Sequence, residues 1–120
     1  MTNDLHVQVR KESSYAVIST DGYINNVGGE KVGEIALGLV DEGYRDLILN
    51  LEKSNVVNSI GVSILIELVE RIQDVDGRLY FCNLTKVIAK TFTIMGLAGV
   101  AGIVATEAEA VAALAAPQGA

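Results

Sequence analysis

Few side chains in this sequence are spaced for catalysis. Gly61-Val62-Ser63 begins like the nucleophile elbow of a hydrolase, but Leu65 occupies the position where that motif requires glycine. The only histidine, His6, lies in a predicted strand at the other end of the chain, where we expect it to face solvent. A hydrolase triad is therefore excluded, and no catalytic residue is expected.

Metal and phosphate sites are also poorly supported. One histidine and one cysteine, Cys82, cannot make a structural zinc site, and the acidic residues lack calcium-loop spacing. Cys82 ends an apolar run and is interpreted as a buried strand thiol. Gly28-Gly29-Glu30-Lys31 has neither dinucleotide nor Walker spacing and is interpreted as a flexible helix entry. We expect no metal and no cofactor.

The segment from Asn50 to Gly61 is a more promising site, because it joins a predicted strand to a predicted helix. Loops at the carboxyl ends of strands are common binding places in open α/β sheets. Either Asn58 or Ser59 can cap the helix. A phosphate on Ser59 would add about −1.5 to −2 charges beside the first-turn amides. Ser59 is therefore either a simple cap or a modifiable switch.

Hydropathy patterns and turn residues predict the elements that position this segment. After the opening strands, a helical period begins at residue 30, and a strong amphipathic helix begins at residue 59. Thr106 and Glu109 match a capping box. The expected strands are 5–10, 15–20, 46–51, 78–83 and a short edge strand at 103–105; the expected helices are 30–41, 59–75, 85–95 and 106–115.

This order predicts an α/β fold. A β-hairpin is followed by alternating helices and strands, which implies a mixed, mostly parallel sheet of four or five strands packed with about four helices. We find no internal repeat or linker, so residues 1–116 are expected to form one domain, with 117–120 as a frayed tail.

Composition narrows the class of protein. Half of the 120 residues are hydrophobic, as expected for an ordered globular domain. Fifteen acidic and nine basic residues give a formal charge of −6, which disfavours nucleic-acid binding and favours a basic partner surface. The amino terminus lacks the features of a signal peptide, and no apolar run reaches membrane-spanning length. The sequence predicts a cytoplasmic protein without membrane insertion.

Four segments of the chain form a recognisable set: Gly22-Tyr23-Ile24-Asn25, the strand at 47–51, Asn58-Ser59-Ile60-Gly61-Val62, and the strand at 78–83. Through these segments the chain resembles the STAS domain family, named for sulfate transporters and anti-sigma factor antagonists. The resemblance covers nearly the whole chain. It implies a free-standing STAS protein of the antagonist type that binds an anti-sigma factor, a serine kinase with a histidine-kinase-like ATPase fold. It also leaves weak homodimerisation open.

The resemblance implies phosphorylation at the helix opening. Family members typically open this helix with Asp-Ser-Ser/Thr-Gly, and a hydroxyl there accepts the phosphate. Here Asn58 replaces the aspartate and Ile60 the second hydroxyl, while Asn25 replaces another family aspartate. Ser59 is therefore the only acceptor that the motif offers. The expected partner-binding residues are Asn25, Asn26, Val57, Asn58, Ser59, Ile60, Gly61 and Ser63.

Docking is expected through the loop from Asn25 to Gly28, the turn from Val56 to Ser59 and the first turns of the helix, with Gly61 allowing close approach. One alternative is a constitutive STAS scaffold or transporter-associated subunit without phosphorylation. Another is weak nucleotide binding or hydrolysis at the helix opening, although that motif contains no lysine, arginine or metal ligand.

Overall fold

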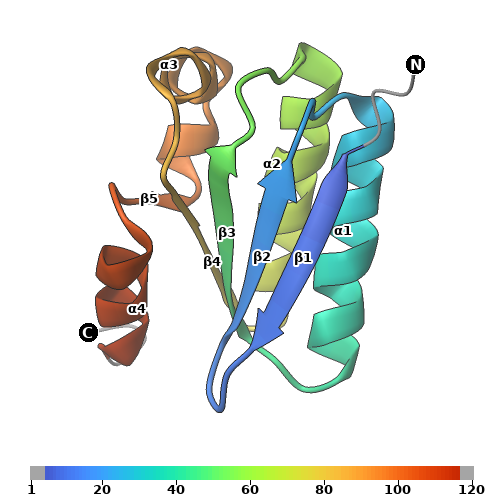
Figure 1. Cartoon of the computed structure of the whole chain (residues 1–120). Helices are drawn as coiled ribbons and strands as arrows, with labels where there is room; N and C mark the ends of the chain where they lie inside the picture. Colours follow the sequence, from blue (N-terminus) through green and yellow to red (C-terminus); the bar gives the residue numbers. More distant parts are fainter. Residues whose placement is uncertain (1–4, 117–120) are drawn as a thin grey trace.

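The computed structural model describes residues 5–116, which build one five-stranded sheet (Figure 1). The strands lie side by side in their order along the chain. β1 and β2 form an antiparallel hairpin, and the remaining neighbours pair in parallel. This confirms the predicted α/β fold with a hairpin start. The strands are β1 (His6–Lys11), β2 (Ala16–Asp21), β3 (Asp46–Lys53), β4 (Arg78–Cys82) and β5 (Gly102–Ile103).

Within the described residues, three α-helices and one short 3₁₀ helix connect the strands, and a fourth α-helix follows the last strand. Each α-helix begins after a polar residue whose side chain accepts a hydrogen bond from an amide three residues further on. Thr106 does so at the predicted capping box, where the Glu109 amide donates to its hydroxyl over 3.2 Å. The helices are α1 (Asn26–Asp41), α2 (Ser59–Gln73), α3 (Lys86–Met95), η1 (Leu97–Gly99) and α4 (Glu107–Ala115).

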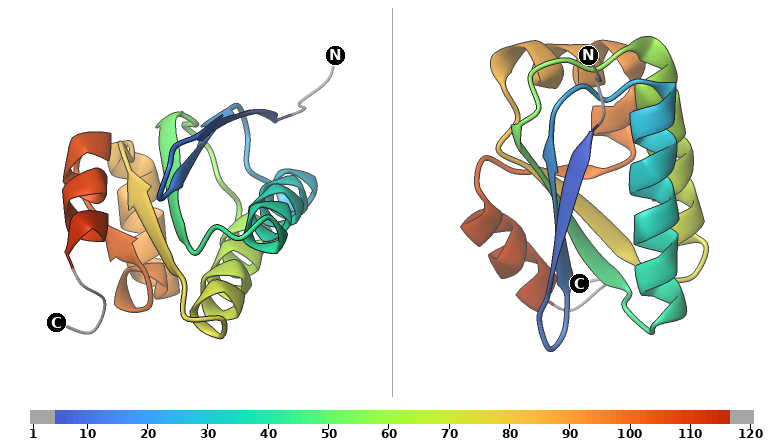
Figure 2. Two further views of the ribbon diagram at one scale, coloured as in Figure 1. Left: turned by 90° about the horizontal axis from the view of Figure 1, so that it is seen from below. Right: turned by 45° about the vertical axis from the view of Figure 1, so that its right-hand side comes forward.

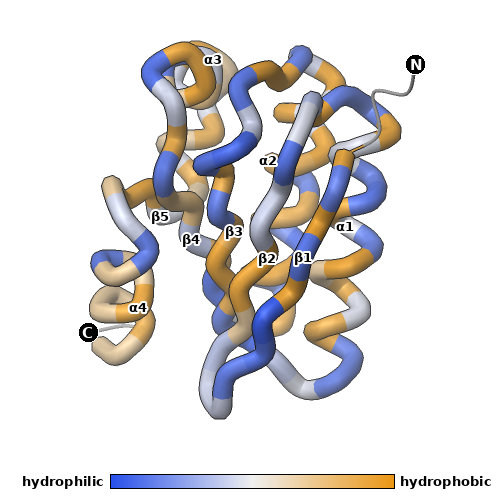
Figure 3. Tube along the Cα trace, in the orientation of Figure 1, coloured by the Kyte–Doolittle hydropathy of each residue, from blue (hydrophilic) through white to orange (hydrophobic). Residues whose placement is uncertain are grey.

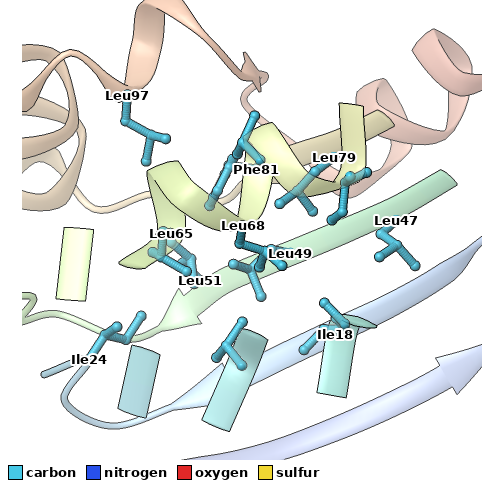
Figure 4. Packing of buried hydrophobic residues seen from close by; sticks show 14 of the residues in the cluster. Ile18, Ile24, Leu47, Leu49, Leu51, Leu65, Leu68, Leu79, Phe81 and Leu97 are labelled. Carbon is cyan, nitrogen blue, oxygen red and sulfur yellow. The ribbon is translucent and has the colours of Figure 1, made fainter. Parts of the chain in front are cut away.

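The sheet separates two apolar clusters because successive strand residues face opposite sides. On β3, Leu47, Leu49 and Leu51 join the larger cluster with α1, α2 and α3, whereas Ile48 packs on α4 (Figure 2). Figure 4 shows the larger cluster, in which leucine and isoleucine side chains interdigitate around Phe81. The Phe81 and Phe92 rings meet edge to face, with centroids 5.4 Å apart. Aliphatic packing therefore provides most of the core.

Several element bounds differ from the sequence predictions. Helix α1 begins at Asn26 and not at Glu30, so the Gly28-Gly29 pair lies inside its first turn. Glycine costs about 1 kcal/mol in a helix, and here the Asn25 cap and close packing offset that cost. β3 continues to Lys53 because it still pairs with Asp21, and α2 ends at Gln73. The predicted tail, 117–120, lies outside the described residues.

The carboxyl ends of β2 and β3 lie at one edge of the sheet, where α1 and α2 begin (Figure 1). Figure 3 shows that the apolar middle of β3 gives way to polar residues at this end. Among the helices between residues 5 and 116, none has the length and apolar character that a membrane span requires. The fold therefore brings two helix openings to one polar edge.

Candidate functional site

The loops that follow β2 and β3 are bonded to each other. Ile24 and Val57 form an isolated parallel bridge beyond the ends of the two strands. The Ile24 amide donates to the Val56 carbonyl over 3.0 Å, and the Asn58 amide donates to the Ile24 carbonyl over 3.1 Å. These bonds hold the openings of α1 and α2 side by side.

A buried pair of hydroxyl groups, those of Thr20 and Ser54, lies a few residues before this bridge along both segments of the chain. The hydroxyls of Thr20 and Ser54 lie 2.7 Å apart and form a hydrogen bond. Both residues are almost fully buried, with exposures of 2% and 0%. An unpaired hydroxyl at such a place would be costly, so the pair joins the ends of the two strands. Sequence reasoning did not identify this pair, because nothing in the local pattern links residues 34 positions apart.

Asn58 caps α2, as one of the two sequence interpretations predicted. Its side-chain oxygen accepts a hydrogen bond from the Gly61 amide over 2.7 Å, and its carbonyl accepts one from Val62 over 3.0 Å. Ser59 is therefore the first helical residue and not the cap. The cap occupies the amides of Gly61 and Val62, and not those of Ser59 and Ile60.

Asn25 builds the same cap at the start of α1. Its side-chain oxygen accepts from the Gly28 amide over 2.8 Å, and its carbonyl accepts from Gly29 over 2.7 Å. The two openings share the pattern Asn, polar, aliphatic, Gly: Asn25-Asn26-Val27-Gly28 and Asn58-Ser59-Ile60-Gly61. Sequence analysis placed residues 25 and 26 in a loop, although this repeated pattern was the available signal for a second helix start.

Glycines bring the two openings into close contact. A Cβ atom at Gly61 would overlap the carbonyl of Ile24. A Cβ at Gly29 would lie 3.3 Å from the Cβ of Ile64 and 3.4 Å from the Cα of Gly61. Gly61 therefore allows the backbone of the same chain, at Ile24, to approach the start of α2 closely. Gly61 itself is buried, so it affects the surface only by setting how closely the two helix openings pack.

The outer surface of the two openings combines exposed aliphatic and polar side chains. Val27 is 64% exposed, Val56 54% and Ile60 56%. Asn26 and Ser59, the first residues of the two helices, are also exposed. We call these five residues the opening surface. Exposed apolar side chains that gather on one face can mark a protein-binding surface.

The predicted site residues differ in how deeply they are buried. Asn26, Ser59, Ile60 and Ser63 are exposed, whereas Asn25, Val57 and Asn58 are half-buried. Ser63 donates its hydroxyl to the Ser59 carbonyl over 3.0 Å. The side-chain oxygens of the two capping asparagines are bonded to their own helices. The structure thus brings all eight predicted residues to one edge, with Ser59 at its surface.

The other reactive side chains lie elsewhere. Cys82 is buried, as predicted, and burial raises the pKa of its thiol to about 12, with a smaller contribution from the Glu107 and Glu52 carboxylates. It therefore remains a neutral thiol at physiological pH. His6 is exposed, as predicted, and lies opposite Asp21 on the hairpin. In the part of the chain that the structure describes, no three His, Cys, Asp or Glu residues are grouped to hold a metal ion.

Comparisons with known proteins agree with this architecture. A family model described as STAS domain matches residues 6–110. The candidate anti-sigma factor antagonist BtrV of Bordetella bronchiseptica is 27% identical over 75 residues. That match covers 62% of this chain and spans only 65% of the length of BtrV.

Solved structures have the same fold at lower sequence identity. An anti-sigma factor antagonist from Mycobacterium paratuberculosis is 17% identical, with a TM-score of 0.84 and coverage of 97% of this chain and 98% of that one. The Bacillus cell fate determinant SpoIIAA, in its phosphorylated form, is 22% identical, with a TM-score of 0.69 and coverage of 91% and 99%. Similarity at these identities concerns the fold.

Proposed function

The chain belongs to the STAS domain family, and we propose that it is a cytoplasmic regulatory module that binds an anti-sigma factor kinase through its opening surface. The observation that carries the proposal is the exposure of Val27, Val56 and Ile60 around Ser59. The names of BtrV and of the Mycobacterium structure, both anti-sigma factor antagonists, support this proposal. In this proposal the chain does no chemistry of its own.

The partner surface has a definite chemical requirement. It must offer apolar groups to the three aliphatic side chains and hydrogen-bonding groups to Asn26 and Ser59. The formal charge of the chain, −6, favours a partner with a basic surface, mainly through faster association. A histidine-kinase-like ATPase that phosphorylates serine is the partner class that the family suggests.

Ser59 is the proposed switch. Its place in the first turn of α2 puts a phosphate near helix amides that the Asn58 cap does not use. The two caps are amides, so no carboxylate of Asn25 or Asn58 would repel that phosphate. On the outside, however, the phosphate would bring about −1.5 to −2 charges into an apolar contact. In this proposal the fold accommodates the phosphate on Ser59, and the phosphate weakens binding of the partner.

A constitutive scaffold is the second candidate, and Ile60 favours it. This side chain occupies the position of the family's second hydroxyl and extends the apolar surface. A chain used only for docking would gain from that replacement and would not need the hydroxyl of Ser59.

Intact-mass spectrometry separates the two candidates. The full chain is incubated with ATP and the anti-sigma factor kinase encoded in the same genome, beside the variants Ser59→Ala and Ser63→Ala. We expect one added phosphate on the wild-type chain and on Ser63→Ala, and none on Ser59→Ala. A complex that forms without any gain in mass identifies the scaffold. If neither complex nor phosphate is detected, the proposed partner class is wrong.

A further inference from the structure

Helix α3 presents two exposed aliphatic side chains, Val87 and Ile94, that the core does not use, and we call this pair the α3 stripe. Val87 is 67% exposed and Ile94 72%, the two highest values among the exposed large hydrophobic residues between 5 and 116. They are seven residues apart, so they lie on one side of the helix, about 10 Å apart along its axis. The inner side of α3, with Ile88 and Phe92, is fully buried. The outer stripe is therefore available for a contact outside the domain.

The surroundings of this stripe are basic, although the chain is acidic. Lys86 and Lys90 are the only charged residues from Asn83 to Thr106, while the chain as a whole carries −6. Both lysines are exposed, and neither takes part in a salt bridge within residues 5–116. In Figure 3, apolar and hydrophilic segments are interspersed along α3. Lys90 and Thr91 lie between Val87 and Ile94 on the same side of the helix, so this side combines two aliphatic groups with a positive charge.

A groove of matching character lies between α1 and α2, with a volume of about 340 Å³. Its lining runs from residue 30 to 37 on α1 and from 64 to 71 on α2, so each side also spans about 10 Å. Glu30, Glu34 and Glu67 line it with one cation, Arg71, and this makes the groove acidic.

The floor of the groove is apolar and has room for a side chain. Leu37 and Ile64 contribute to it. Gly33 lies among them, and a Cβ placed there would have no atom within 4 Å. The groove and the α3 stripe therefore complement each other in length, polarity and charge.

We propose that α3 of one copy of this chain docks into the α1–α2 groove of a second copy. The two surfaces of a single copy do not meet, because Val87 and Ile94 are exposed and α2 lies between α1 and α3 in Figure 1 and in the left view of Figure 2. Such a contact joins unlike surfaces, so it builds rings or open chains. It does not depend on the proposed regulatory function.

Sedimentation equilibrium of the full chain tests this pairing. One stripe in one groove is smaller than a standard interface of about 1,600 Å², so we expect weak association, with a Kd of about 0.1–1 mM. The weight-average mass should rise beyond that of a dimer with concentration. It should fall with added salt, because the contact brings opposite charges within about one Debye length, roughly 8 Å at physiological ionic strength.

Two single substitutions distinguish the halves of the contact. Ile94→Asp removes the stripe and keeps the groove, whereas Gly33→Leu fills the groove and keeps the stripe. Each variant alone should remain monomeric. An equimolar mixture should form a 1:1 dimer and nothing larger, because each copy then has one working surface. Gly38→Leu is the matched control, since Gly38 is also an unhindered glycine of α1 but does not line the groove; it should assemble like the wild type.

The same experiment can overturn the proposal. A wild-type chain that stays monomeric at millimolar concentration contradicts it. Loss of assembly in Ile94→Asp but not in Gly33→Leu would mean that α3 pairs with another α3 and not with the groove. A mixture of the two variants that remains monomeric would contradict the pairing as well.

Discussion

The openings of α1 and α2 are built alike but offer different chemistry. In both, an asparagine caps the helix, an exposed aliphatic residue follows two positions later, and a buried glycine occupies the third position. The first helical residue differs: it is Asn26 in α1 and Ser59 in α2. The shared features pair the two openings, and only the opening of α2 begins with the hydroxyl that the proposed switch requires.

The comparison also separates residues that stabilise the two openings from residues that we propose to contact a partner. The side chains of Asn25 and Asn58 bond to amides of their own helices, and Gly61 lies against the Ile24 backbone. Substitution of any of these three residues should lower the stability of the fold. Val27, Ile60 and Ser59 are turned outward, and their loss should affect binding. Family motifs combine both kinds of residue in one short segment, and the structure separates them.

The largest expected effect on stability is that of Gly61→Ala. Its Cβ would overlap the Ile24 carbonyl, so the two openings must move apart, at a cost of about 1–3 kcal/mol in the free energy of unfolding. Gly28→Ala is the matched change in α1, and its Cβ would lie 3.0 Å from the Tyr23 carbonyl, a tight but less severe contact. Urea denaturation should rank Gly61→Ala below Gly28→Ala. Equal stabilities would mean that the openings are not packed through Gly61.

Removal of either capping side chain should lower the stability by a smaller amount, and by a similar amount in the two helices. Asn58→Ala and Asn25→Ala each delete one side-chain acceptor, which should lower the free energy of unfolding by about 1 kcal/mol. Asn58→Asp keeps an acceptor at the same place and should retain most of the stability. Thermal denaturation at neutral pH measures all three. An Asn58→Ala variant as stable as the wild type would show that the cap contributes nothing.

The smallest effect, opposite in sign, concerns a glycine of α1 outside the openings. Gly38 lies in the exposed part of the helix, and a methyl group added to its Cα would have no atom within 4 Å. Gly38→Ala should therefore stabilise the chain by about 0.5–1 kcal/mol, because alanine favours helix and loses less entropy. Chemical denaturation would measure this gain. A loss of stability would indicate that α1 needs its glycines along its whole length, and not only where it meets α2.

Much of the fold followed from local patterns. Hydropathy patterns and turn residues predicted strands at 5–10, 15–20 and 46–51, and the structure has β1, β2 and β3 at these places, with β1 and β2 paired as a hairpin. The start of α1 did not follow, because Gly28-Gly29 has low helix propensity and only packing against α2 favours the helix there. Local sequence also contains no sign of the Thr20–Ser54 pair or of the bridge between the two loops, since both depend on contacts between distant residues.

The strand–helix junction at residues 50–61 lies where the sequence placed it, and its role in binding stays a prediction, but the division of the segment into cap and exposed residues required the three-dimensional structure. Sequence alone left open whether Asn58 or Ser59 is the cap, and the hydrogen bond from the Gly61 amide to Asn58 decides it. The part that Asn25 plays became clear only when the second opening was found beside the first.

Isothermal titration calorimetry with the anti-sigma factor kinase tests the central claim most directly. The wild-type chain is compared with Ser59→Asp and with Ser14→Asp, which places the same charge in the exposed β1–β2 turn. A charge at Ser59 should weaken binding at least tenfold, about 1.4 kcal/mol, while Ser14→Asp should bind like the wild type. Equal affinity of Ser59→Asp and wild type would contradict the account, because the opening of α2 would then not be the surface that the partner reads.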